Sequence, residues 1–393
     1  MRQRIAATKT TVTSTFVVLL IAGLLSTNAS ATSEQVLHNF TGGADGGYAL
    51  RSLIQDKSGN LYGTAYFGGT YGAGAVFELS PAQGSWSQTV LYNFTGGADG
   101  ANPATPLVFD SAGSLYGTTD SGGANSKGTV FELSPSEAGG WTETVLYSFC
   151  AQPGCSDGSY PASGVVMDNS GNLYGATGNG VFELTHSGSG WTETLLYSGQ
   201  TYFGVTLDSA GNLYGAALGG YNGFVFQLSP VQGGGWKEST IYTFKGGKDG
   251  RLPQGGVILD ASGSIYGTTG YGGPSNKGTV YKLTHRKNGW YETRLQTFGS
   301  SKNSPVTPEG ELTFDTDGNI YGATIYGGTA NAGTIFKLTA SNSFFKASVL
   351  WDFSGSNGAN PAAGVTVDKA GNVYGTTCEG GLNGHGVVFE VTQ

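Results

Sequence analysis

Seven side chains stand where the repeats of this 393-residue chain differ from one another, and each carries a group that could bind a ligand. They are Arg51, Arg251, Glu311, Tyr48, Tyr160, Tyr202 and His385. Arginine binds a carboxylate through two parallel hydrogen bonds, and aromatic faces stack on sugar rings. The set therefore predicts a site around one funnel for an acidic or neutral sugar. The alternative is an Arg–Glu surface pair with tyrosines exposed to water.

The sequence supports no catalytic or metal-binding constellation. Its four histidines do not form a group, and His385 alone is placed to act as a general acid or base. No spacing matches a zinc site, and a single recurring Asp per turn does not make a calcium loop. We assign no catalytic residue, no metal and no cofactor.

Three cysteines allow one short disulfide. Cys150 and Cys155 enclose a Pro-Gly turn, so we expect them to be bonded, with two free thiols as the alternative. Cys378 is left over, and we interpret it as a variable loop residue rather than a nucleophile.

The elements that position these groups come from one phrase. DSAGSLYGTT, which starts at Asp110, recurs with small changes at Asp56, Asp168, Asp208, Asp260, Asp315 and Asp368. The Asp carboxylate can accept backbone N–H bonds two residues on, Gly can take a positive φ, and the Gly after Tyr leaves room for a neighbouring ring. We interpret the phrase as scaffold. The alternative is a ring of seven metal or sugar sites.

The repeats predict a β-propeller. The phrase returns every 40 to 58 residues, and the second repeat contains four strand-like runs, PLVFD, GSLYGTT, GTVFELS and WTETVLYSF. Residues 32–40 match a fourth run, and the chain ends with a third run. We therefore expect one all-β, seven-bladed domain over residues 32–393, with four antiparallel strands per blade. The N-terminal strand would complete the last blade.

The first 31 residues have the pattern of a secretory signal peptide. Basic residues precede the apolar run FVVLLIAGLL, and Ala29-Ser30-Ala31 gives a cleavage site before Thr32. We expect a secreted or periplasmic monomer without a membrane span after cleavage, and an uncleaved anchor is the alternative. The net charge of −8 without a basic stripe argues against nucleic acid as a partner.

The motifs DSAGSLYGTT, GTVFELS, VLYSF and DGANP resemble the bacterial GloVer repeat of Gloeobacter and Verrucomicrobia, a choice-of-anchor family. The resemblance implies a secreted β-propeller without one established activity. Our first hypothesis is a non-catalytic binding or scaffold module that recognises an extracellular polysaccharide or a surface protein. A carbohydrate-active enzyme, a lyase or hydrolase working in the funnel, is the alternative, so enzymatic activity stays open. A third possibility is a matrix protein without a small ligand.

Overall fold

The computed structural model describes residues 32–393 except 137–138, 162, 189, 202 and 342–343. Thr32–Gln393 form one compact unit. The predicted signal peptide and Tyr202 lie outside the described residues. Among the residues described, no helix has the length and apolarity that a membrane span requires.

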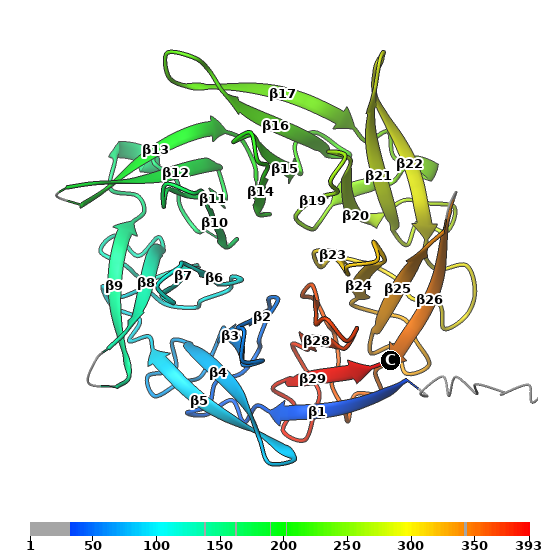
Figure 1. The fold of residues 1–393 in the computed structure, drawn as a ribbon, viewed down its shortest axis with the longest axis horizontal. Helices are drawn as coiled ribbons and strands as arrows, with labels where there is room; N and C mark the ends of the chain where they lie inside the picture. The colour runs from blue at the N-terminus through cyan, green and yellow to red at the C-terminus, as the bar shows by residue number, and fades with distance from the viewer. Residues whose placement is uncertain (1–31, 137–138, 162, 189, 202, 342–343) are drawn as a thin grey trace, which may run out of the picture. The chain divides into compact units, whose positions relative to one another are not determined.

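Seven antiparallel sheets form the ring of a seven-bladed β-propeller, as predicted (Figure 1). The first blade contains β2 (Ile54–Gln55), β3 (Leu61–Ala65), β4 (Ala75–Ala82) and β5 (Ser85–Asn93). The second contains β6 (Val108–Phe109), β7 (Leu115–Thr119), β8 (Thr129–Pro135) and β9 (Trp141–Ser148). The third contains β10 (Val165–Met167), β11 (Leu173–Thr177), β12 (Gly180–Ser187) and β13 (Gly190–Ser198).

The remaining blades follow the same order from the axis outward. The fourth contains β14 (Val205–Leu207), β15 (Leu213–Ala217), β16 (Phe224–Pro230) and β17 (Trp236–Thr243). The fifth contains β18 (Arg251–Pro253), β19 (Ile258–Leu259), β20 (Ile265–Tyr271), β21 (Thr279–Arg286) and β22 (Gly289–Thr297). The sixth contains β23 (Thr313–Phe314), β24 (Ile320–Thr324), β25 (Thr334–Ala340) and β26 (Phe345–Asp352). The short 3₁₀ turns η1 (Pro153–Cys155) and η2 (Gly247–Asp249) lie in connections between blades.

The seventh blade joins the two ends of the chain. It contains β27 (Thr366–Val367), β28 (Val373–Thr376), β29 (Val387–Thr392) and, outermost, β1 (Ser33–Asn39). β1 pairs antiparallel with β29 from Ser33 opposite Thr392 to Asn39 opposite Val387. The predicted closure by the N-terminal strand is confirmed, and β1 covers the edge that β29 would otherwise expose.

The repeated Asp holds a turn in every blade. At Asp56, one carboxylate oxygen accepts the backbone N–H groups of Ser58 at 2.8 Å and Asn60 at 2.9 Å, and the other accepts the Tyr62 hydroxyl at 3.3 Å. The same pattern of bonds occurs at Asp110, Asp168, Asp208, Asp260, Asp315 and Asp368. The carboxylates are used by the turn itself, which supports the scaffold interpretation.

Aromatic rings fill the layers between blades. A Cβ at Gly63 would lie 2.8 Å from the Phe77 ring, so the glycine after the repeated tyrosine makes room for that ring, as predicted. Four interblade clusters combine the repeated Tyr of one blade with Leu and Phe of the next. The tryptophans at the start of the outer strands are partly buried against these clusters. They cover the interblade core rather than form a separate platform.

Antiparallel order puts two kinds of loop on the same side of the ring. The connections between blades bridge to the loops that join the second and third strands, at Gly47–Phe67, Ala101–Ser121, Arg251–Tyr271, Val306–Tyr326 and Ala359–Glu379. We call this side, defined by these pairs and the loops around them, the connection face. The Asp turns and the hairpins that carry the tryptophans form the opposite side, the hairpin face.

Candidate functional site

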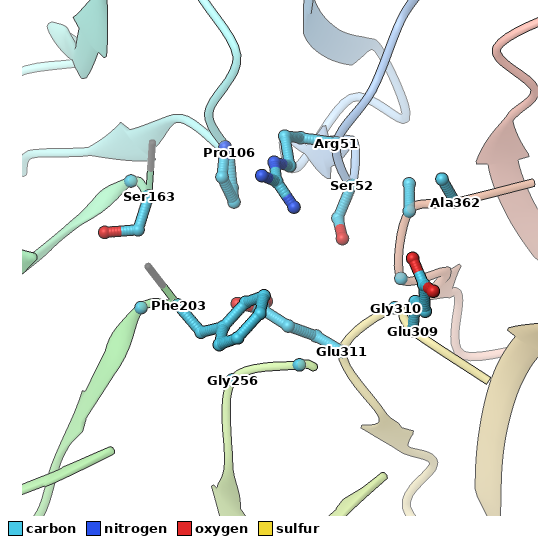
Figure 2. A pocket seen from close by; sticks show the side chains of 15 residues that line it. Arg51, Ser52, Pro106, Ser163, Phe203, Gly256, Glu309, Gly310, Glu311 and Ala362 are labelled. Carbon is cyan, nitrogen blue, oxygen red and sulfur yellow. The ribbon is translucent and has the colours of Figure 1, made fainter. Parts of the chain in front are cut away.

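The seven blades converge on a narrow space that we call the neck. Each blade contributes one to three residues located just before its innermost strand, and the polar ones are Arg51, Ser52, Ser163, Glu309 and Glu311. Figure 2 shows the side chains of Arg51, Phe203 and Glu311 in this space. Its cavity volume is about 20 Å³, which suits a water molecule or a small ion, whereas ligand sites measure about 300–1,000 Å³. The neck has no room for a sugar ring.

Small residues around the neck make way for one long side chain. A Cβ at Gly256 would lie 2.6 Å from Oε1 of Glu311, and a Cβ at Gly204 would lie 3.5 Å from the same atom. A Cβ at Gly310 would lie 2.3 Å from the carbonyl oxygen of Ala363. Close approach to backbone therefore requires glycine at Gly310, whereas Glu311 occupies the space beside Gly256 and Gly204.

Arg51 is the cation of the neck. Its Nε donates a hydrogen bond to the carbonyl oxygen of Ala104 at 2.8 Å, which ties the first blade to the second. Burial lowers the pKa of Arg51, and the charges of Glu311, Glu309 and nearby Asp120 oppose that shift. The guanidinium nevertheless keeps its charge, because its ordinary pKa is far above neutrality.

Three carboxyl groups surround this guanidinium. Burial raises the pKa values of Glu311, Glu309 and Asp120, and the positive charge of Arg51 lowers each of them in part. The Tyr66 hydroxyl also donates to Asp120 at 3.4 Å. Burial therefore favours the protonated form of each carboxyl group, and the charge of Arg51 favours the ionised form.

The structure describes all three cysteines, which were the subject of two predictions. Cys150 and Cys155 form a disulfide in the connection after β9. Cys378 is buried beside the neck rather than in an exposed loop, and burial raises its pKa to about 11. Its thiol is therefore protonated at neutral pH and is no nucleophile.

Arg251 lies on the connection face, outside the neck. It starts β18 and pairs with Tyr271 of β20, which places its guanidinium carbon 5.3 Å from the centre of the Tyr271 ring. This geometry is a cation–π contact. Tyr271 itself is exposed.

Tyr48, Tyr160 and His385 also lie on the connection face. The Tyr48 ring contacts Phe67 and His385, with centroid distances of 5.6 and 5.8 Å. The Lys127 ammonium lies 4.4 Å from the centre of the Tyr160 ring. The structure thus brings Arg51 and Glu311 together in the neck and leaves the other four described candidates outside it. The seven predicted side chains do not form one pocket.

The family model of the Gloeobacter/Verrucomicrobia repeat matches residues 22–198 and 200–393. The chain belongs to this repeat family. No curated protein matches it.

Solved structures share the fold of this Gloeobacter/Verrucomicrobia repeat protein at low identity. YCF48, in a structure described as bound to D1 peptide, has a TM-score of 0.55 and 11% identity, over 92% of this chain and 97% of that chain. A protein from Lactobacillus plantarum has a TM-score of 0.54 and 16% identity, over 81% and 88%. A "putative 6-phosphogluconolactonase" from Bacteroides uniformis has a TM-score of 0.53 and 12% identity, over 80% and 88%. These similarities show the fold alone.

Few features among the described residues of this repeat protein support hydrolytic catalysis. Gly154–Gly158 has GxSxG spacing, but it overlaps the end of the disulfide loop and lacks the strand–turn–helix that a nucleophile elbow needs. No group of three or more His, Cys, Asp or Glu side chains among the described residues has the arrangement of a metal site.

Two features were missed from the sequence. Glu309 stands where other repeats have Leu50, Ala104 or Gln254, so the column comparison that found Glu311 could have found it. Exposed aromatic residues lie on the connection face. Those that directly precede a Gly-Gly pair occupy one position of the repeat, so a comparison of the repeats could have identified them. They are Phe67, Tyr271 and Tyr326.

Proposed function

We propose that this repeat protein is a non-catalytic binding protein of the cell exterior that recognises a polysaccharide through its connection face. The observation that carries the proposal is the set of exposed aromatic side chains in the loops of that face. They are Phe67, Tyr71, Tyr160, Tyr221, Tyr271 and Tyr326. Exposed aromatic groups on one face of a soluble protein mark a binding surface, and their flat rings suit sugar rings.

Charged groups beside these rings favour a glycan with polar or acidic substituents. Arg251 lies over Tyr271 and Lys127 lies over Tyr160, so two of the aromatic positions combine a ring with a cation. A sugar that stacks on such a ring can also place a hydroxyl or carboxylate against the cation. The connection face offers this combination without the size limit of the neck.

Retention on insoluble plant and microbial polysaccharides tests the proposal. We expect the mature chain, Thr32 to Gln393, to be retained selectively, and the double variant Arg251→Ala, Tyr271→Ala to lose retention about tenfold, because removal of one stacked ring costs about 1–1.5 kcal/mol. Arg286→Ala, Tyr291→Ala is the matched control. Its guanidinium lies 5.1 Å from the Tyr291 ring, but on a β21–β22 hairpin of the opposite side.

An equal loss of retention in both variants would show that the polysaccharide binds elsewhere than on the connection face. No retention on any polysaccharide would remove the sugar proposal and direct the search toward a surface protein.

The enzyme alternative depends on Glu309, Glu311 and Arg51, and it requires the neck to open, because its cavity of about 20 Å³ does not hold a sugar ring. Carboxyl groups with raised pKa values are typical of catalytic acids, which is the observation in its favour. Its test is the release of soluble sugars from any glycan that retains the protein. Release by the parent chain that Glu311→Gln abolishes would establish it, and retention without release supports binding alone.

The exterior location is part of the same proposal. The signal-peptide pattern of residues 1–31 and the disulfide between Cys150 and Cys155 both support export, because disulfides persist in oxidising compartments. Intact mass of the chain recovered outside the cytoplasm tests it. We expect a chain that starts at Thr32, and a full-length cytoplasmic chain would refute it.

A further inference from the structure

One position of the outer strand carries an acid or amide in six of the seven blades. Its members are Glu34, Gln88, Glu143, Glu193, Glu238 and Glu292, with Ala347 in the sixth blade. Each is paired with an apolar residue of the third strand, for example Gln88 with Leu79 and Glu143 with Leu133. The column is thus defined by strand register.

In the first blade the side chain at this position ties the outer strand to the connection entering the blade. Nε2 of Gln88 donates a hydrogen bond to the carbonyl oxygen of Asp45 at 2.8 Å. The Asp45 carboxylate is already occupied, because it accepts the Thr41 backbone N–H at 2.9 Å and lies 3.1 Å from Nε2 of His38. The amide of Gln88 therefore supplies the donor that the loop carbonyl needs.

Five blades have an acid where the first blade has this amide. Oε1 of Glu143, Glu193 and Glu292 is buried and has no hydrogen-bond partner among the described residues, and the same holds for Oε1 of Glu34, whose other oxygen has a partner. An ionised carboxylate only accepts hydrogen bonds, so it cannot replace the donor of Gln88. These acids share the strand position from which Gln88 donates to a loop carbonyl, and a buried acceptor without a donor is costly.

We propose that Glu143, Glu193 and Glu292 are protonated in the folded chain and donate the hydrogen bond that Gln88 donates in the first blade, so that the connections between blades are locked by acid and released by base. The lock spans the second, third and fifth blades, whose outer strands are β9, β13 and β22 (Figure 1). It acts on the same connections that form the connection face.

The charged groups around the three acids agree with this assignment. Glu143 faces Asp99 and Tyr92, and Asp99 already accepts the Thr95 backbone N–H at 2.7 Å and the Tyr92 hydroxyl at 3.1 Å. Burial, and then the charge of Asp99, raise the pKa of Glu143 to about 7.

The other two acids have corresponding surroundings. Glu193 faces Asp157 and Tyr147, and burial followed by the charge of Asp157 raises its pKa to about 7. Glu292 faces Asp249 and Tyr242 together with Arg294 and Lys245. Burial and Asp249 raise its pKa, while the two cations lower it in part.

The remaining acids of the column show what removes the lock. Nδ2 of Asn357 donates to Oε2 of Glu34 at 3.3 Å, so an amide in the connection supplies the donor there. Glu238 is exposed, and the short connection before its blade contains no Asp. Glu238 is therefore a matched control on the same strand position.

The sign of the pH dependence follows from the raised pKa values. The folded chain keeps protons that the unfolded chain releases above its ordinary pKa of 4.5. The stabilisation is complete below that pH and is lost as the pH rises through about 7.

Thermal melting of the full mature chain from about pH 4.5 to about pH 8.5 tests the proposal. We expect the triple variant Glu143→Gln, Glu193→Gln, Glu292→Gln to melt with the parent chain at the acid end and about 4 °C above it at the alkaline end. Glu238→Gln should leave the pH profile unchanged. Gln88→Glu should make the chain more sensitive to base.

Infrared spectra give an independent readout, because a protonated carboxyl band near neutral pH should disappear in the triple variant. A constant difference between the triple variant and the parent across this pH range would overturn the proposal. A calcium-dependent rise in the parent's melting temperature that the triple variant lacks would also overturn it, since a cation would then fill the place assigned to the proton.

Discussion

Replacement of Asp315 by Ala separates the scaffold interpretation of the repeated phrase from a functional one. Asp315 accepts the backbone N–H groups of Asp317 and Asn319 at 3.0 and 2.9 Å, the Asn319 amide at 2.7 Å and the Tyr321 hydroxyl at 2.9 Å. The Tyr321 side chain is fully buried. Asp315→Ala therefore removes the common acceptor of one turn and the anchor of one core ring.

The expected loss is about 3 kcal/mol. The Asp317 N–H is exposed and regains a hydrogen bond to water, so it contributes little. The other three donors are partly buried, and each lost bond costs about 1 kcal/mol. This loss of free energy, divided by the unfolding entropy of the whole propeller, corresponds to a fall in melting temperature of about 4 °C.

Tryptophan fluorescence during heating measures the shift, and Asp317→Ala is the control. Asp317 lies in the same turn, and its side chain is exposed. It should change the melting temperature by less than about 1 °C, because surface substitutions cost within about 0.5 kcal/mol. Equal shifts in the two variants would refute the turn argument. Loss of polysaccharide retention in Asp315→Ala without a shift would show that the phrase binds a ligand.

Three further predictions test packing, charge and closure. Gly322→Ala should cost about 1–3 kcal/mol by thermal melting, because its Cβ would lie 2.6 Å from the Phe336 ring; Phe336→Leu should then relieve the cost. Asp260, whose pKa is lowered to about 2, should stabilise the fold above pH 3.8 by about 1 kcal/mol after solvent screening. That stabilisation is lost as the pH falls through 2, and Asp260→Asn should flatten this acid limb. Deletion of residues 32–40 exposes the edge of β29 and removes buried Leu37 and Phe40, so size exclusion should show aggregation and melting should occur about 5 °C or more lower.

Much of the fold could be predicted because the residues that determine its turns and strands recur in each repeat. Asp-x-x-Gly specifies a turn, alternating apolar residues specify strands, and the offset between the first and last runs specifies closure at β1 and β29. The sequence also indicated why Gly follows the repeated Tyr. These signals come from neighbouring residues or from the repeat period. The fold could therefore be predicted without first predicting contacts between residues distant in the sequence.

The candidate site was only partly predictable, because its contacts cross between blades. Arg51 and Glu311 are 260 positions apart by residue number, and only the ring brings them to one neck. Column comparison identified both as exceptions but could not show that Arg251 projects along a different loop, over Tyr271. Periodicity finds residues that differ between blades, whereas the direction of each side chain depends on contacts between loops, such as the pairing of Arg251 with Tyr271.

The residues that differ between blades divide into two sets with different physical roles. In the neck, the charges of nearby carboxyl groups act on Arg51 and offset its positive charge. Glu311 fills the space beside Gly256, so the residues of the neck themselves occupy its volume. On the connection face, aromatic rings remain exposed, with Tyr221 at 83% and Tyr71 at 63%. Exposed apolar surface of this kind costs free energy unless a partner covers it. A partner of this propeller is therefore to be sought on the connection face rather than in the neck.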